Sequence, residues 1–287
     1  MRKKVPNHQL STRLVIAAVA SICLCNVIPA QKIALLTPDK TPQAEAITNE
    51  IAKSLPVSVI DDSLADAAFR SIGVENPFNL SLDEAKRIGS AIGCDAFLIV
   101  KADTLRRTSS ARPLYYESYV TIFAVATRTG HLIWWDLKNA EENSPEAADK
   151  KLREAIANDS QTQGRGLIAS IGKDSSSSVD NEFGEIPAEG SSEAKGFRSP
   201  IPYLRIKPEY TPLAYLYDAK GTVEVVVELD EKGTVVSTEI ARWAGFGLDD
   251  SVIQAVRKMN WRPAERAGRP LPTRFLLRYN FRKIEKE

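Results

Sequence analysis

Adjacent carboxylates are the first candidates for chemistry in this chain, because two neighbouring acids can share acid and base roles. Asp61 and Asp62 form such a pair after an apolar stretch. Ser63 and Asp66 follow them with the spacing of a helix start, where short polar side chains accept hydrogen bonds from free N–H groups. The sequence therefore predicts that these aspartates cap a helix rather than catalyse a reaction.

The remaining reactive side chains are few and scattered. The chain has two histidines, His8 in an N-terminal leader and His131 beside a turn, and neither belongs to a metal-binding spacing. Cys94 enters an apolar stretch, which predicts a buried structural thiol. No nucleophile elbow and no phosphate-binding loop occurs in the sequence. We therefore expect a protein that is not an enzyme, with no catalytic residue, no metal and no cofactor.

The N-terminus has the pattern of an export signal. Basic residues up to Arg13 precede an apolar run over 14–25. That run is shorter than the roughly 20 residues of a membrane-spanning helix, so we predict a signal peptide over 1–30, cleaved after Ala30. The alternative is an uncleaved signal-anchor, because the apolar segment extends over 14–30. The predicted location is the periplasm, with anchoring to the inner membrane as the alternative.

Residues 31–157 alternate between strand-like and helix-like stretches, which predicts one α/β domain of the sandwich type. The Ser81-Leu82-Asp83-Glu84 sequence has the form of a capping box, and Ser144-Pro145 opens a last helix. The expected strands are 32–37, 57–60, 97–102, 116–126 and 131–137. The expected helices include 42–55, a helix ending near Ile92, and the one that opens at Ser144-Pro145.

The segment 158–202 is rich in Ser, Gly, Glu and Asp and almost free of aromatic residues. Such a composition buries too little apolar surface to offset the entropy of ordering the chain. We therefore predict a flexible, disordered linker over 158–202, followed by a C-terminal domain over 203–287.

The C-terminal domain has the clearest pattern. Val223, Val225, Val227 and Leu229 alternate with Glu224, Val226 and Glu228, which predicts a strand with one buried face. Asp230-Glu231-Lys232-Gly233 supplies a turn, and Val236, Thr238 and Ile240 are expected on the inward face of the returning strand. A helix follows, with Asp249 and Asp250 in its first turn as capping groups and Pro263 as its stop. The alternation over 274–281 predicts a final strand, which makes the whole chain an α+β protein.

The domain over 31–157 resembles a group of periplasmic families. Its segments EAKRIGSAIGCDAFLIVKAD and TRTGHLIWWD are similar to those of the TolB N-terminal and CsgG-like α/β domains. The resemblance covers roughly 125 residues and concerns the fold. It implies a domain that serves assembly and contact, and it transfers no functional residue.

The C-terminal region resembles another family more specifically. The segments PEYTPLA, GTVEVVVELDEKGTVVSTEI and GLDDSVIQAVRKMNWRPAERAGRPLPTRFLLRYNF closely resemble the TonB C-terminal domain from Pro208 to Arg282. The resemblance implies a three-stranded antiparallel sheet with helices, whose last strand accepts an extended peptide of an outer-membrane TonB-dependent transporter as an added strand. The residues that it assigns to this contact are Arg274, Phe275, Leu276, Leu277, Arg278, Tyr279, Asn280 and Phe281. Trp261, Arg262 and Pro263 match the helix-exit motif, where they either pack and end the helix or contact the partner.

Two functions remain open. In the first, the protein is a TonB-like energy transducer that couples an inner-membrane proton-driven motor to the transporter. In the second, it is an exported periplasmic adaptor or scaffold that transmits no force. The segment Arg242-Trp243-Ala244-Gly245 replaces the Ser-Ser-Gly that is frequent in the family, and the linker lacks Pro-Glu and Pro-Lys repeats.

The charge of the chain and the open edge of its predicted last strand bear on which partners the protein can bind. The formal net charge is +1, from 38 Lys and Arg against 37 Asp and Glu, so no global electrostatic partner follows. The stretch 242–283 is locally basic, which fits either a solvated surface or an acidic partner such as an anionic cell-wall polymer. We expect no nucleic-acid partner, because the sequence has no motif for one. An open edge strand would also permit a strand-exchanged dimer.

Overall fold

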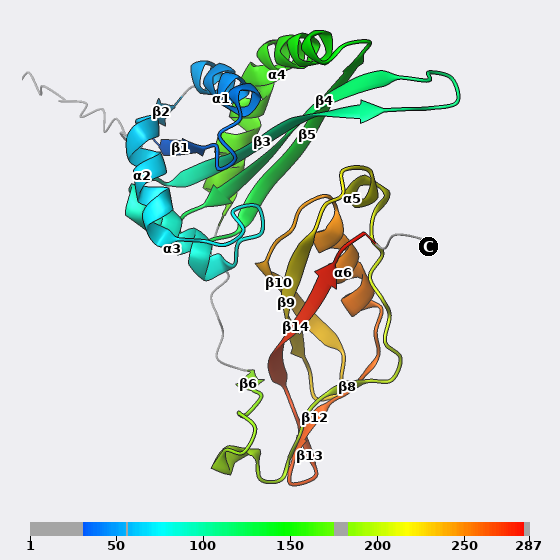
Figure 1. Cartoon of the computed structure of the whole chain (residues 1–287). Coiled ribbons are helices and arrows are strands. Elements are labelled where there is room, and N and C mark those ends of the chain that lie inside the picture. Colours follow the sequence, from blue (N-terminus) through cyan, green and yellow to red (C-terminus); the bar gives the residue numbers. More distant parts are fainter. Residues whose placement is uncertain (1–30, 56, 175–182, 284–287) are drawn as a thin grey trace, which may run out of the picture. The chain divides into compact units, whose positions relative to one another are not determined.

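The computed structural model describes residues 31–55, 57–174 and 183–283 of the 287-residue chain (Figure 1). The predicted leader over 1–30 lies outside the described residues. In the described part of the chain, no helix is long and apolar enough to cross a membrane.

The first half of the described chain forms a five-stranded sheet with the order β2-β1-β3-β4-β5. β1 pairs in parallel with β2 and β3, whereas β3, β4 and β5 are antiparallel neighbours. The elements are β1 (Lys32–Leu36), α1 (Pro42–Ser54), β2 (Ser58–Val59), α2 (Asp62–Ile72), α3 (Leu82–Ile92), β3 (Ala96–Arg107), β4 (Tyr115–Ala126), β5 (Leu132–Glu142) and α4 (Pro145–Lys173).

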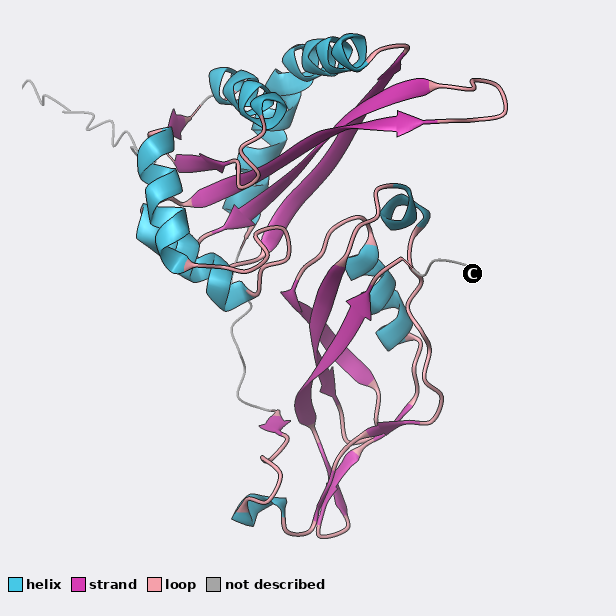
Figure 2. Cartoon of the chain, viewed as in Figure 1, coloured by secondary structure: helices cyan, strands magenta, loops and turns pink. Residues whose placement is uncertain are grey.

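Helices cover both faces of this sheet, as Figure 2 shows. Side chains alternate between the two faces of a strand, so Leu98 and Val100 of β3 pack with α1 and α4, while Phe97 and Ile99 pack with α2 and α3. Both cores are made almost entirely of aliphatic and aromatic groups. The result is the three-layer α/β sandwich that the alternation of sequence patterns predicts.

Three of the predicted helix starts are confirmed. Asp61 is the N-cap of α2, and its carboxylate accepts hydrogen bonds from the backbone N–H groups of Ser63 and Leu64, both at 3.1 Å. Ser81 and Glu84 form the complete capping box of α3. Ser144 caps α4. Asp61 is therefore a helix cap as predicted, whereas Asp62 is the first residue of the helix rather than its cap.

The predicted domain boundary at residue 157 is wrong, and so is the flexible, disordered linker for the described parts of 158–202, whose residues 175–182 lie outside the described residues. α4 continues to Lys173. Leu167 is buried in the same core as Leu152 and Ile156, and Ile171 packs against that core. These apolar residues recur on one helical face beyond the polar stretch, so helix propagation allows them to be buried. The many polar residues between them hide that recurrence in the sequence.

The second half of the described chain is built on a sheet with the order β10-β9-β14-β6. Its antiparallel strands β10, β9 and β14 are the three that the family resemblance implies, and β6 adds a short parallel fourth. The elements are β6 (Gly184–Glu185), η1 (Ser192–Ala194), β7 (Phe197–Arg198), β8 (Ile201–Pro202), α5 (Pro212–Leu216), β9 (Gly221–Leu229), β10 (Val235–Arg242), α6 (Leu248–Arg257), β11 (Trp261–Arg262), β12 (Ala264–Arg266), β13 (Arg269–Leu271) and β14 (Thr273–Phe281).

The end of the predicted linker is likewise part of this fold. β7 pairs with β12 and β8 pairs with β11, so the strand partners of the C-terminal domain begin well before Tyr203. Short pairings of this kind depend on chain segments far apart in sequence. A window of local composition over 183–202 therefore cannot reveal them.

Two further expectations about this half are corrected. Val236 is exposed rather than inward, because a bulge between Val235 and Ser237 shifts the alternation of β10 by one residue. α6 ends at Arg257, several residues before Pro263, because residues 261–262 leave the helix to pair with β8. The turn prediction at Gly233 is confirmed by its positive φ of 80°.

Candidate partner-binding edge

The last strand, β14, is held along one side only. Its nine residues pair antiparallel with β9 without interruption, from Thr273 opposite Leu229 to Phe281 opposite Gly221. Its apolar side chains face α6, where Phe275, Leu277, Tyr279 and Phe281 pack against the buried core. Val223, Val225, Val227 and Leu229 supply the fully buried layer of β9. This one-sided burial fixes the register, because a slip of one residue would expose the whole apolar row.

The other side of β14 is open for most of its length. β6 covers only its first two residues, pairing Gly184 with Thr273 and Glu185 with Arg274. Among the described residues, no strand pairs with this side from Phe275 to Phe281. An uncovered edge presents backbone N–H and C=O groups in the pattern that another strand requires.

The residues whose backbone faces this edge follow from one hydrogen bond. The N–H of Gly184 donates to the carbonyl of Pro272 at 3.2 Å, so the backbone of residue 272 points toward the β6 side. Strand geometry repeats every second residue. The N–H and C=O groups of Leu276, Arg278 and Asn280 therefore point to the open edge, and those of the intervening residues bond β9.

The arginines of β14 are engaged across the sheet. Arg274 lies 3.2 Å from Glu239 and 3.7 Å from Glu228, and the Arg278 Nε donates to Glu224 Oε1 at 2.7 Å. These pairs lie on one face of the sheet, beside the half-exposed Leu276. They leave the backbone edge itself accessible while they orient the long side chains away from it.

The opposite edge strand, β10, is closed where it ends. Ser81 forms an antiparallel bridge with Arg242, and the backbone N–H of Trp243 donates to the Leu80 carbonyl at 3.3 Å. Arg242 also donates to the Asn79 carbonyl at 2.7 Å and lies 3.0 Å from Glu84. The segment before α3 thus occupies the end of the β10 edge.

Trp243 is the centre of this closure. Its side chain is 1% exposed, stacks on Phe123 with a centroid distance of 5.3 Å, and belongs to the core formed by the sheet, α2 and α3. Gly245 follows in the left-handed region, and a Cβ there would lie 2.7 Å from the Phe123 ring. The glycine therefore permits the close approach that buries the tryptophan.

A family comparison identifies the part of the chain that contains this strand. Residues 206–282 match the family model described as Gram-negative bacterial TonB protein C-terminal. Residues 206–282 form a TonB C-terminal domain. The match confirms the family that the sequence motifs indicate, and its limits nearly coincide with the stretch from Pro208 to Arg282. The TonB-like family is not one of enzymes.

Similarities to solved structures are weak. The TonB C-terminal domain of Pseudomonas aeruginosa is 20% identical, with 37% of this chain and 97% of that chain covered at a TM-score of 0.27. A lipoprotein of Neisseria meningitidis is 16% identical, with 45% and 96% covered at a TM-score of 0.32. The LpoB C-terminal domain of Salmonella enterica is 12% identical, with 41% and 87% covered at a TM-score of 0.28. No curated protein matches the chain.

The helix-exit residues of the TonB C-terminal domain divide into two roles. Trp261 is buried and meets the Phe275 ring edge-on at 5.2 Å, so it packs behind β14 rather than at the edge. Arg262 is exposed beside it, and Pro263 is partly buried. Gly233 lies close to the backbone of Trp261. A Cβ at position 233 would lie 2.0 Å from the Trp261 carbonyl oxygen.

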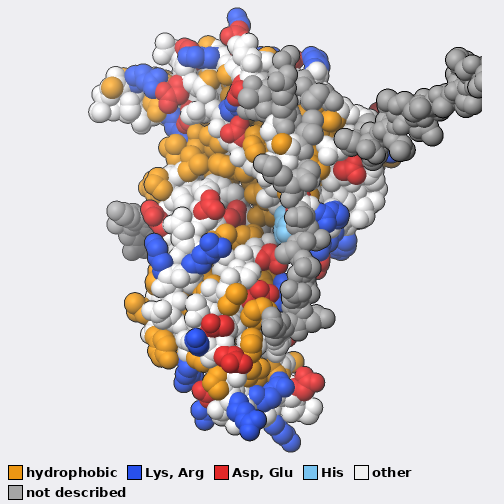
Figure 3. All heavy atoms as spheres, turned by 180° about the vertical axis from the view of Figure 1, so that it is seen from behind, with side chains coloured by type: hydrophobic (Ala, Val, Ile, Leu, Met, Phe, Trp, Pro, Cys, Tyr) orange, Lys and Arg blue, Asp and Glu red, His pale blue; other side chains and the backbone are white. Residues whose placement is uncertain are grey.

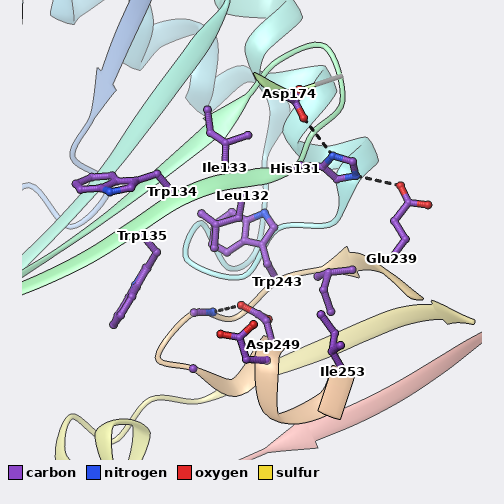
Figure 4. Close-up of a pocket in the computed structure, with 14 residues that line it drawn as sticks. His131, Leu132, Ile133, Trp134, Trp135, Asp174, Glu239, Trp243, Asp249 and Ile253 are labelled. Carbon is purple, nitrogen blue, oxygen red and sulfur yellow. Dashed lines mark hydrogen bonds and ion pairs between the residues drawn. The ribbon is translucent and has the colours of Figure 1, made fainter. Parts of the chain in front are cut away.

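His131 is the titratable residue whose role sequence reasoning missed. It lies between Asp174, with Nδ1 3.4 Å from the carboxylate, and Glu239, with Nε2 at 3.0 Å (Figure 4). The hydrogen bond to Glu239 is the main cause of a raised His131 pKa, with partial burial opposing it. Glu239 is 108 residues away in sequence, so no local pattern could have paired the two.

Asp249 lines a cavity of about 510 Å³ with His131, Trp135 and Trp243 (Figure 4). Its carboxylate accepts from the backbone N–H groups of Ala244 and Gly245, each at 2.8 Å, so it supports the preceding loop instead of capping α6. Burial raises its pKa to about 6 against those two hydrogen bonds.

The other candidate chemistry is structural. Cys94 is buried as predicted, and burial raises the pKa of its thiol. Across residues 31–55, 57–174 and 183–283, no three His, Cys, Asp or Glu side chains lie close enough to hold a metal ion. The described residues thus offer an exposed strand edge as the site with a clear physical use.

Proposed function

We propose that this protein is a TonB-like partner-binding protein of the bacterial envelope, and that β14 binds an extended peptide of an outer-membrane transporter by strand addition. The observation that carries the proposal is the open side of β14 from Phe275 to Phe281. Proteins usually block such edges, so a long uncovered edge favours a binding role.

The peptide would gain most of its affinity from the backbone. Leu276, Arg278 and Asn280 present alternate N–H and C=O groups, and an added strand bonds them without regard to its own side chains. Because β14 is fixed in register by β9 and α6, its groups are ordered before the partner arrives. Preorganisation of this kind lowers the entropic cost of binding.

Proline substitution tests this mode directly. Leu276→Pro removes an N–H that faces the edge and places a ring where a partner strand would lie, while the neighbouring bonds to β9 remain. The binding of synthetic peptides from periplasm-facing segments of outer-membrane transporters should weaken by at least about tenfold. Leu276→Ala is the matched control, because it removes the side chain and keeps the N–H, and it should bind nearly as well as the wild type. Equal binding by both variants would contradict strand addition.

A second candidate function, the periplasmic adaptor that transmits no force, is favoured by a different observation. Trp243 and the Asn79 contacts join the TonB C-terminal domain to the α/β sandwich through buried groups. A domain built into a larger folded unit suits an assembly role. Intact mass and membrane fractionation of the expressed chain separate the two functions, since the transducer requires a retained membrane anchor.

A further inference from the structure

A cavity of about 510 Å³ lies between β5, the segment after β10 and the start of α6 (Figure 4). The rings of Trp135 and Trp243 both line it, the first coming from β5 and the second from the segment after β10. Its volume is in the range of roughly 300–1,000 Å³ that is typical of pockets for small molecules. No residue of β14 lines it, so the cavity is separate from the open strand edge.

The charged side chains of the cavity lining are mostly acidic, and no Lys or Arg is among them. Asp174 and Glu239 are both bonded to His131. Asp249 and Asp250 form no ion pair within the described part of the chain. Burial and the nearby charge of Asp250 both raise the pKa of Asp249. The cavity therefore holds two adjacent carboxylates without a counter-ion, an arrangement that a bound cation would stabilise.

Two hydrogen-bond donors of the same cavity lack a partner. The indole Nε1 atoms of Trp135 and Trp243 are buried, and neither has an acceptor among the described residues. Trp243 is only 1% exposed as a whole. A Cβ at position 245 would lie 3.0 Å from Trp135 Nε1, so Gly245 leaves the space beside this N–H open. Buried polar groups normally have partners, and a ligand oxygen would supply one here.

The remaining surface of the cavity is apolar. Leu132 of β5, Ile240 of β10 and Ile253 of α6 line it, and each is only partly buried. Figure 3 shows the face of the molecule that carries the histidine, where hydrophobic and acidic side chains lie close to its pale blue ring. Apolar side chains beside two indole rings suit an apolar ligand body, and the face of an indole ring also attracts a cation.

We propose that this cavity binds a small organic cation, a primary amine joined to an apolar body that carries an oxygen acceptor. The ammonium group lies at Asp249 and Asp250, where charge-assisted hydrogen bonds are available. The body packs between the indole rings and Ile253, and its oxygen accepts from an indole N–H. Because the lining comes from both β5 and α6, the bound ligand also stabilises the contact between them. The inference does not depend on strand addition at β14.

Tyramine is the probe that tests this site, because it combines an ammonium group, a ring and a phenolic oxygen. Titrated into the full chain at about pH 7, it should shift the NMR signals of the Trp135 and Trp243 indole N–H groups. The signal of Trp261 should stay in place, because that residue does not line the cavity.

Three analogues of tyramine separate the parts of the proposed ligand. 4-Ethylphenol lacks the ammonium group, and 3-(4-hydroxyphenyl)propanoate replaces it with a carboxylate. Each should bind at least about tenfold more weakly than tyramine. Ethylamine keeps the ammonium group and lacks the ring, and it should be weaker by a similar factor. Binding of 4-ethylphenol or of the carboxylate as tight as that of tyramine would overturn the assignment of a cation site.

Substitution of Asp250 supplies the matched test in the protein. Asp250 is exposed at the surface end of the cavity, so the fold should tolerate its replacement. Asp250→Asn should weaken tyramine by about fivefold and leave 4-ethylphenol unchanged, and Asp250→Lys should weaken tyramine further. Glu231→Gln is the control, because it removes the same charge from an exposed turn outside the cavity. Equal losses from Asp250→Asn and Glu231→Gln, or a tyramine titration that leaves both cavity indoles unshifted, would overturn the inference.

Discussion

The two outer antiparallel strands of the C-terminal sheet, β10 and β14, differ in how their free sides are covered. β10 ends in residues that are bridged and buried, with Arg242 paired to Ser81 and Trp243 inserted against Phe123. β14 is covered by β6 at its start and is open from Phe275 to Phe281. The end of β10 is therefore occupied at Arg242, whereas β14 is free over a longer stretch.

The contact at the end of β10 involves the segment Arg242-Trp243-Ala244-Gly245. Trp243 of this segment is buried in the core of the α/β sandwich. We therefore predict that this end of β10 controls stability and that the open edge of β14 controls binding.

The largest effect is expected from Trp243→Ala. It removes a fully buried ring and leaves a cavity against Phe123, which should lower the free energy of unfolding by about 3–5 kcal/mol in urea denaturation. Trp243→Phe retains a stacked ring and should cost clearly less. A loss below about 1 kcal/mol for the alanine variant would show that the tryptophan does not anchor the domain.

Asn79→Ala should have the next largest effect. Its buried amide donates to the carbonyls of Thr222 and Trp243 at 2.8 and 2.5 Å, and its oxygen accepts from the Thr222 N–H at 2.9 Å. Loss of these bonds leaves buried groups unpaired, so we expect about 1–3 kcal/mol of destabilisation and faster amide exchange at Thr222. Asn76→Ala is the control, because that side chain is exposed. Comparable losses from both variants would contradict the role of Asn79.

The smallest effect concerns pH. The His131 pKa is raised by Glu239 and Asp174, so the stabilisation is complete below the unfolded-state pKa of histidine and is lost as pH rises through the folded-state value. The difference in unfolding free energy between about pH 5 and about pH 8 should therefore shrink in His131→Gln, by under about 1 kcal/mol.

Asp249 changes the unfolding free energy with pH in the same direction as His131, so the two contributions must be measured separately. Its pKa of about 6 lies above the usual value, so the folded state holds a proton that the unfolded chain releases, and stability falls as pH rises between those values. Asp249→Asn should flatten that part of the profile and leave the His131 part. A pH profile unchanged by His131→Gln would show that its two carboxylate contacts contribute nothing measurable.

Local chemistry in the sequence predicts much of the fold. Ser81 with Glu84, Gly233 in a turn and the alternation over 223–229 each specify their element through neighbours a few residues away. The strand at 274–281 is predictable for the same reason. The family motifs then identify it as the candidate edge, which the register with β9 supports.

The predictions that fail are those that depend on contacts between residues far apart in the sequence. The continuation of α4 depends on Leu167 reaching a core formed by residues far earlier in the chain. The exposure of Val236 depends on a bulge in β10, and the salt bridge of His131 depends on Glu239. The pairing of β11 with β8 needs residues 201–202, which composition alone assigns to a linker. Pairings that the folded chain creates are invisible to periodicity and spacing.

Amide hydrogen exchange resolved by NMR, with and without a bound transporter peptide, tests the central claim most directly. Strand addition predicts that the N–H groups of Leu276, Arg278 and Asn280 gain protection together, because they face the open edge. Those of Phe275 and Leu277 already bond β9 and should change little. Protection that appears along β10 instead, or that leaves all three edge amides unchanged while the peptide is bound, would contradict the account.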